Sequence, residues 1–157
     1  MTPTFWNLIQ QSKGDPDQLR SLLVEKPDAE VLEFNAQFYS ALVELNQWKI
    51  WGAGEVMAEG LSDDGFHYFR SWIIGKGEEA FKTALTSPDD LGKFADEDDE
   101  FDNEALEYVA VEILEERELE DNRGADGSNA DGEPTGEAWD PEELYSLFPK
   151  LAEQFGD

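Results

Sequence analysis

The residues best suited to chemistry lie in one short segment near the middle of the chain. Asp63, His67 and Arg70 are spaced at i, i+4 and i+7, so a helix places them on one face, with Asp64 alongside. A carboxylate beside an imidazole raises its basicity and fixes its tautomer, as an acid–base pair requires, and an arginine binds anionic groups. A structural interpretation stands beside this one, because acids in a first helical turn interact favourably with the helix dipole. We assign no catalytic residue and define one candidate pocket for a ligand or partner: Asp63, Asp64, His67 and Arg70.

Metal and cofactor sites have little support in the sequence. The chain has no cysteine and one histidine, which argues against a zinc site. The acidic run at residues 96–103 lacks the glycine that a calcium loop needs at its sixth position, and Ala130 interrupts the ligand alternation of residues 126–131. No glycine-rich phosphate loop is present either. We therefore predict no cofactor and no specific metal site.

The charge of the chain restricts its partners. Its 157 residues include 38 acidic and 11 basic side chains, a formal net charge of −27 at pH 7. A field this negative repels the phosphates of nucleic acids and of anionic lipids. We expect no direct binding to nucleic acid or membrane, and a basic protein as the partner.

Most of this charge lies in the C-terminal part of the chain. Residues 1–94 hold 15 acids and 8 bases, whereas residues 95–157 hold 23 acids and 3 bases. A helix expected from Glu104 to about Glu120 places glutamates around its exposed side, and carboxylates at fixed spacing can replace a phosphate backbone in a Lys/Arg groove. The predicted acidic contact surface comprises Asp96, Asp98, Asp99, Glu100, Glu107, Glu112, Glu115 and Glu116.

Three functional interpretations remain open at this point. The first is a non-enzymatic acidic interaction protein, such as a nucleic-acid mimic or an inhibitor or immunity-type protein that binds a basic partner. The second is a small-molecule-binding or hydrolytic domain that uses the candidate pocket. In the third, the charge serves only solubility or adaptation to high salt. The residues favour a binding protein over an enzyme, and they leave the oligomeric state open.

The spacing of apolar residues predicts an all-α fold. Apolar side chains recur every three or four positions, and Asp15-Pro16, Ser62-Asp63 and Ser87-Pro88 are typical helix starts. We expect one compact bundle of about seven to nine helices. Seven core residues are predicted to be buried: Phe34, Phe38, Leu42, Phe66, Phe69, Trp72 and Ile73.

The chain reads as a single domain, residues 1–157, in four parts. Residues 1–94 form an aromatic-rich core, and residues 95–120 form an acidic loop and helix. Residues 121–138 form a flexible Gly-rich loop, and residues 139–157 form C-terminal helices that dock back on the core. The sequence shows neither a signal peptide nor an apolar run long enough to span a membrane. We therefore expect a soluble, cytoplasmic protein.

Three stretches together are similar to a known bacterial family. They are Phe5-Trp6-x-x-Ile9, the segment SDDGFHYFRSWIIGKG at residues 62–77, and SPDDL at residues 87–91. In these stretches the chain resembles the domain of unknown function 4240 family, over roughly its first hundred residues. The resemblance implies a small, mostly helical domain, and it supplies no catalytic residues.

Overall fold

Helices begin in this protein at the caps and prolines that the sequence marks. The computed structural model describes residues 1–156. The backbone N–H of Gly65 donates to the Ser62 hydroxyl at 3.1 Å, and that of Asp17 donates to the Asp15 carboxylate at 3.1 Å. The first six helices are α1 (Pro3–Ser12), α2 (Pro16–Leu23), α3 (Asp28–Glu44), α4 (Trp48–Ala58), α5 (Asp63–Lys76) and α6 (Glu78–Thr86).

The second half of the chain contains less helix. Its elements are a 3₁₀ helix η1 (Pro88–Phe94), α7 (Glu104–Glu116), a short 3₁₀ helix η2 (Pro141–Glu143), α8 (Leu144–Leu147) and α9 (Pro149–Phe155). Residues 1–156 contain nine α-helices and no β-strand, which confirms the all-α prediction.

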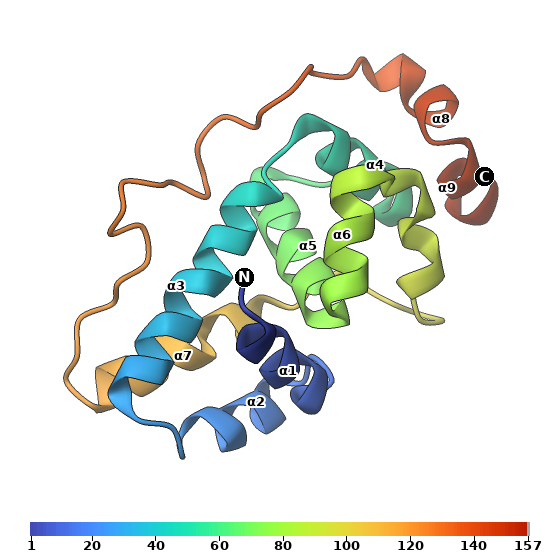
Figure 1. Ribbon diagram of the computed structural model, residues 1–157. Coiled ribbons are helices and arrows are strands. Elements are labelled where there is room, and N and C mark those ends of the chain that lie inside the picture. Colours follow the sequence, from blue (N-terminus) through green and yellow to red (C-terminus); the bar gives the residue numbers. More distant parts are fainter. Residues whose placement is uncertain (157) are drawn as a thin grey trace.

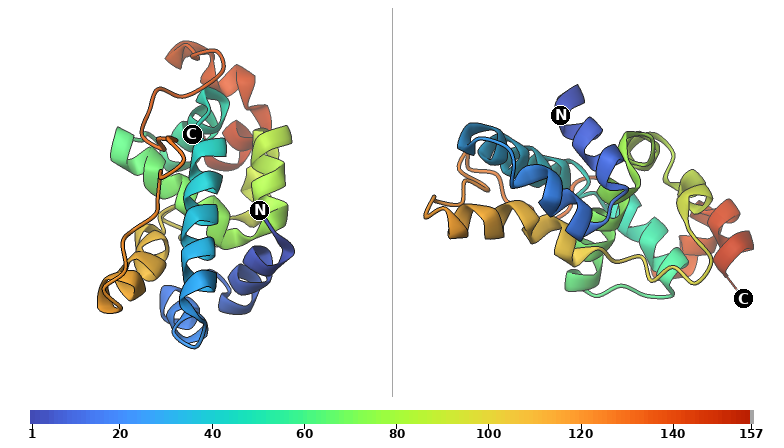
Figure 2. Two further views of the ribbon diagram at one scale, coloured as in Figure 1. Left: turned by 60° about the vertical axis from the view of Figure 1, so that its left-hand side comes forward. Right: turned by 90° about the horizontal axis from the view of Figure 1, so that it is seen from below.

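The helices form one bundle with α5 at its centre. Helix α5 contacts α1, α3, α4, α6 and α7. Figures 1 and 2 show α3 beside α7 at one end of the molecule and α9 at the opposite end, where it packs on η1 and α4. The segment from residue 62 to 77 therefore lies where side chains from most of the bundle converge.

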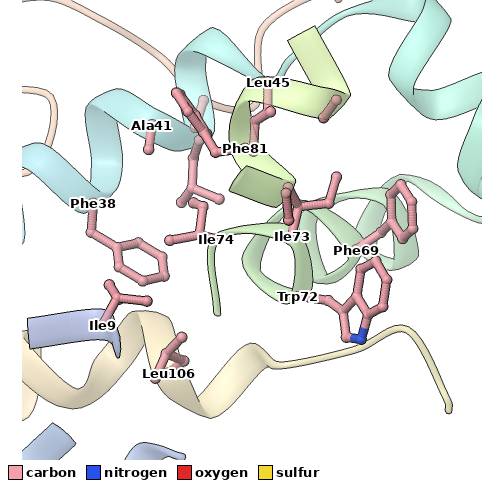
Figure 3. Close-up of a cluster of buried hydrophobic side chains, with 14 of the residues drawn as sticks. Ile9, Phe38, Ala41, Leu45, Phe69, Trp72, Ile73, Ile74, Phe81 and Leu106 are labelled. Atoms are coloured by element: carbon pink, nitrogen blue, oxygen red, sulfur yellow. The ribbon is translucent and has the colours of Figure 1, made fainter. Parts of the chain in front are cut away.

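The core is aromatic and aliphatic, and α5 supplies its middle. Figure 3 shows Ile9, Phe38 and Leu106 close to Ile74, while Phe69 and Trp72 lie together on the other side of α5. The rings of Phe69 and Trp72 stack with centroids 5.6 Å apart. All seven predicted core residues are at most 3% exposed, which confirms that prediction.

The segment between α7 and α8 is irregular but follows the bundle closely. In Figure 1 it runs along α3 and then past α4. Asn35 on α3 donates to Asp121 and Asn122 at 2.8 Å, and Ala130 N–H donates to the Tyr39 hydroxyl at 3.0 Å. The predicted loop at 121–138 is thus attached to α3 by side-chain hydrogen bonds, which its composition did not indicate.

Within residues 1–156, no helix is long and apolar enough to cross a membrane.

Candidate functional site

A cleft of about 450 Å³ lies between the first turns of α4 and α5 and the segment 130–134. We refer to it as the α4–α5 cleft. Asp63, Asp64 and Arg70, three of the four predicted pocket residues, line it. The other lining residues are not among the four predicted ones: Asn46, Trp48, Trp51, Phe66, Ala130, Asp131, Gly132, Glu133 and Pro134.

Carboxylates surround the mouth of this cleft. Asp63 and Asp64 are exposed in the first turn of α5, and Asp131 and Glu133 are exposed on the opposite wall. Among the described residues, no ion pair within 4.0 Å involves Asp63, Asp64 or Glu133. The mouth therefore carries negative charge that the protein itself does not neutralise.

One wall of the cleft is a stack of aromatic rings that supports an arginine. Trp48 and Trp51 are stacked with centroids 5.3 Å apart, and Trp51 and Phe66 with centroids 4.7 Å apart. The guanidinium carbon of Arg70 lies 4.5 Å from the centroid of Phe66. This stacking holds the plane of the guanidinium group in a fixed orientation.

Arg70 is buried and only partly hydrogen-bonded. It is 2% exposed, and its Nη1 donates to the carbonyl oxygens of Leu42 and Ala130 at 2.9 and 2.8 Å. Its Nη2 lies 3.9 Å from Asp131 Oδ1, beyond hydrogen-bond distance, and within the described structure Nε has no partner. Burial lowers the pKa of Arg70 to about 10, although the negative charges of Asp131 and Glu107 raise it. The guanidinium group therefore stays cationic at neutral pH.

His67, the fourth predicted pocket residue, lies beside the cleft and is bound on both ring nitrogens. Its Nδ1 is 2.8 Å from Asp131 Oδ1, and its Nε2 is 2.7 Å from Glu107 Oε2. Burial lowers the pKa of His67, but hydrogen bonds to the two carboxylates and the charge of Glu107 outweigh it, so the pKa is raised. These partners come from distant segments, whereas spacing had pointed to Asp63.

Glu107 is not on the acidic contact surface, and that part of the prediction is wrong. Its side chain is 2% exposed, and it accepts a hydrogen bond from Arg123 Nη1 at 3.2 Å as well as contacting His67. Glu107 shares a helix face with Ala110 and Leu114, which are buried. The guanidinium of Arg123 and the imidazole of His67 compensate the cost of burying its charge.

The other predicted surface acids differ in how far they are neutralised. Glu112, Glu115 and Glu116 are exposed on α7, but Arg20 of α2 lies 2.6 Å from Glu116 Oε2 and 3.7 Å from Glu112 Oε2. The loop before α7 exposes Asp96, Asp98 and Glu100.

Asp99, in the same loop, is half-buried and has a structural role. It accepts hydrogen bonds from the indole of Trp72 at 3.0 Å and from the backbone N–H groups of Asp96 and Phe101. Burial raises the pKa of Asp99. These hydrogen bonds and the charge of Lys76 lower it by a larger amount, so the net shift is downward. Asp99 therefore stabilises the loop and offers little to a partner.

The family is shown by a match over most of the chain. The family model described as "Protein of unknown function (DUF4240)" matches residues 1–116. The chain belongs to the DUF4240 family. No curated protein and no solved structure is significantly similar to it. The matched DUF4240 region supplies the α4 and α5 walls of the cleft, and the wall at 130–134 lies beyond it.

Proposed function

We propose that this DUF4240 protein is a non-enzymatic interaction protein of the bacterial cytoplasm that binds a basic protein partner. The observation that supports it is the concentration of exposed, unneutralised carboxylates around the α4–α5 cleft. The cleft wall at 130–134 belongs to a stretch, residues 124–149, that contains seven acidic residues and no lysine or arginine. Opposite charge at such a surface steers a basic partner toward it and suppresses wrong partners.

Two acidic faces are available to that partner. On the α7 face, Arg20 lies close to two of the three exposed glutamates. On the cleft face, Asp63, Asp64 and Glu133 form no ion pair within the described residues. The cleft face is also concave, so a lysine or arginine side chain there meets carboxylates from two sides. These differences favour the cleft face as the principal contact, with the α7 face as an extension that would suit a nucleic-acid mimic.

The test compares two variants that remove the same charge from different faces. One carries Asp63→Asn, Asp64→Asn and Glu133→Gln, and its matched control carries Glu112→Gln, Glu115→Gln and Glu116→Gln. Fluorescence anisotropy with a labelled lysine- and arginine-rich peptide should show wild-type binding that weakens steeply from about 0.1 M to about 1 M salt, as the Debye length falls from about 10 to about 3 Å.

The loss of affinity should be about tenfold for the cleft variant and smaller for the α7 variant. A larger loss in the α7 variant would place the contact on the α7 face instead. If both variants bind the peptide as tightly as wild type at low salt, the charge is only a solvated surface or a salt adaptation, and the proposal fails.

A further inference from the structure

A short stretch of the chain after α7, residues 124–134, lies against the bundle with few contacts, and we call it the strap. The residues on either side of it are hydrogen-bonded to α3 and to the turn that follows α3. Among the described residues, the strap itself forms hydrogen bonds to the bundle only through Ala130, Asp131 and Gly132. Ala130 is also its only buried residue. With so little buried surface, these hydrogen bonds determine how firmly the strap is held.

Ala130 holds the strap directly over Arg70. Its N–H donates to the Tyr39 hydroxyl of α3 at 3.0 Å, and its carbonyl oxygen accepts from Arg70 Nη1 at 2.8 Å. Gly132 adds a hydrogen bond from Asn46 at 2.9 Å. The strap therefore forms part of the cover that keeps Arg70 only 2% exposed.

Asp131, the third attachment, is held by the only histidine of the chain. Its Oδ1 is 2.8 Å from His67 Nδ1, while His67 Nε2 is 2.7 Å from Oε2 of Glu107 on α7. A protonated imidazole donates from both nitrogens, whereas a neutral one has a single donor and a single acceptor. When His67 loses its proton, it can therefore donate to only one of the two carboxylates.

The contact that is lost is the one to the strap. The Glu107 side chain is 2% exposed, so water cannot solvate it, and it keeps the remaining N–H of the imidazole together with Arg123 at 3.2 Å. The Asp131 side chain is 69% exposed, so water replaces the imidazole there at little cost. Without the imidazolium charge between them, the two carboxylates also repel each other.

The other charged and titratable groups around His67 leave this order unchanged. Arg70, on the same helix, is cationic and opposes protonation of the imidazole, and Arg123 lies beside the buried carboxylate. The ring of Tyr68 is 6.0 Å from that of His67 between centroids, and Tyr39 of α3 is bound to the strap backbone. Within the part of the chain that the structure describes, α1, α3, α4 and α6 bring no carboxylate within 4.0 Å of the ring nitrogens.

The protonated form of His67 extends to higher pH than in a free histidine. Burial and the charge of Arg70 lower its pKa, but the hydrogen bonds to Glu107 and Asp131 and the charge of Glu107 raise it by a larger amount. The net shift is upward from 6.5, so the contact between Asp131 and His67 weakens only as pH rises through that raised value.

We infer that the strap is a pH-dependent cover, which protonated His67 fastens over Arg70 and which loosens when the imidazole loses its proton and releases Asp131. In the loosened form the α4–α5 cleft loses its wall at 130–134, and the guanidinium group of Arg70 is uncovered. No partner takes part in this change, so it can be tested on the protein alone and separately from the proposed function.

The Ala130 amide, which is bound to Tyr39, reports on the strap through its rate of hydrogen exchange. NMR measures this rate in the full chain, relative to the intrinsic rate of an unstructured peptide at each pH. In wild type, the protection of Ala130 should fall about tenfold between about pH 6 and about pH 9, which corresponds to a shift of about one unit in the pKa of His67. The amide of Ile73, in the core of α5, should exchange more slowly than that of Ala130 throughout.

Two variants remove one charge each from the strap. Asp131→Ala removes the contact with His67, so the protection of Ala130 at about pH 6 should already be as low as in wild type at about pH 9, and it should change little with pH. Glu133→Ala is the matched control, because Glu133 forms no ion pair among the described residues, and it should behave as wild type. Both side chains are exposed, so both variants should fold.

Three results would overturn the inference. Protection of Ala130 that does not depend on pH in wild type would show that the strap stays fastened, as when Asp131 moves onto Arg70 Nη2, which is 3.9 Å away. Equal exchange of Ala130 and Ile73 at every pH would show that the strap opens only when the whole protein unfolds. Equal losses of protection in the two variants would assign the effect to net charge and not to His67.

Labelling of arginines with phenylglyoxal tests directly whether Arg70 is uncovered. At a single pH, with the labelled residues located by mass spectrometry, Arg70 should react faster in Asp131→Ala than in Glu133→Ala. Arg20, whose side chain is 36% exposed, provides the internal reference and should react equally in both. Equal labelling of Arg70 in the two variants would contradict the inference that the strap covers this group.

Discussion

The imidazole of His67 is hydrogen-bonded to the buried carboxylate of Glu107, with 2.7 Å between Nε2 and Oε2. The second ring nitrogen of His67 is 2.8 Å from Asp131 Oδ1, so one imidazole joins α5, α7 and the segment after α7. A protonated imidazole donates from both nitrogens, which is the form that suits two carboxylates. The charge state of His67 is therefore coupled to the attachment of the segment that forms one wall of the cleft.

The free energy of unfolding should depend on pH through His67. Its pKa is raised in the folded protein, so its contribution to stability is fully present below the ordinary value near 6.5 and is lost as pH rises through the folded-state pKa. Urea unfolding of wild type between about pH 6 and 9 should show stability falling with pH. His67→Gln, which removes the only histidine, should flatten that profile, and identical profiles would contradict this assignment.

Removing the buried charge of Glu107 should destabilise the protein more than removing an exposed one. Glu107→Gln leaves His67 and Arg123 facing a neutral group, and we expect a loss of about 1.5 to 3 kcal/mol in the free energy of unfolding. Glu115→Gln on the exposed face of the same helix is the control and should change stability by about 0.5 kcal/mol or less. Equal effects would show that the buried network contributes little.

Phe69 should be among the most sensitive core positions. It is fully buried and stacks on Trp72, so Phe69→Ala should cost about 3 to 5 kcal/mol as a large-to-small change. Tyr145→Ala provides the control, because that ring is 55% exposed. Chemical denaturation measures both, and a loss below about 1 kcal/mol at Phe69 would contradict the packing described.

The sequence predicted the helices and the core well because both depend on local patterns. A cap such as Ser62 and an apolar residue every three or four positions determine where a helix begins and which face it buries. The burial of Glu107 and its contact with His67 depend on residues 40 positions apart. Asp131 is farther still, at 64 positions, in a segment whose glycines indicate only a loop. Such long-range pairings leave no periodic signal in a single sequence.

The docking of the C-terminal segment on α4 depends on a glycine, and this gives a prediction in which two effects have opposite signs. A Cβ atom at position 52 would lie 2.9 Å from Phe148 Cε2 and 3.0 Å from the indole of Trp139. Helix propensity alone predicts that Gly52→Ala stabilises α4 by about 1 kcal/mol. Overpacking against two aromatic rings costs about 1 to 3 kcal/mol, so we expect a net loss of stability.

The indole of Trp139 distinguishes the two effects directly. Its Nε1 donates to the carbonyl oxygen of Trp48 at 2.7 Å, and this contact fixes the segment that leads to α8. If Gly52→Ala displaces that ring, tryptophan fluorescence should shift toward the emission of exposed indole, and cleavage by trypsin at Lys150 should become faster. An alanine variant that is more stable than wild type, with unchanged fluorescence, would show that the C-terminal segment adjusts without loss and that Gly52 is not needed for its docking.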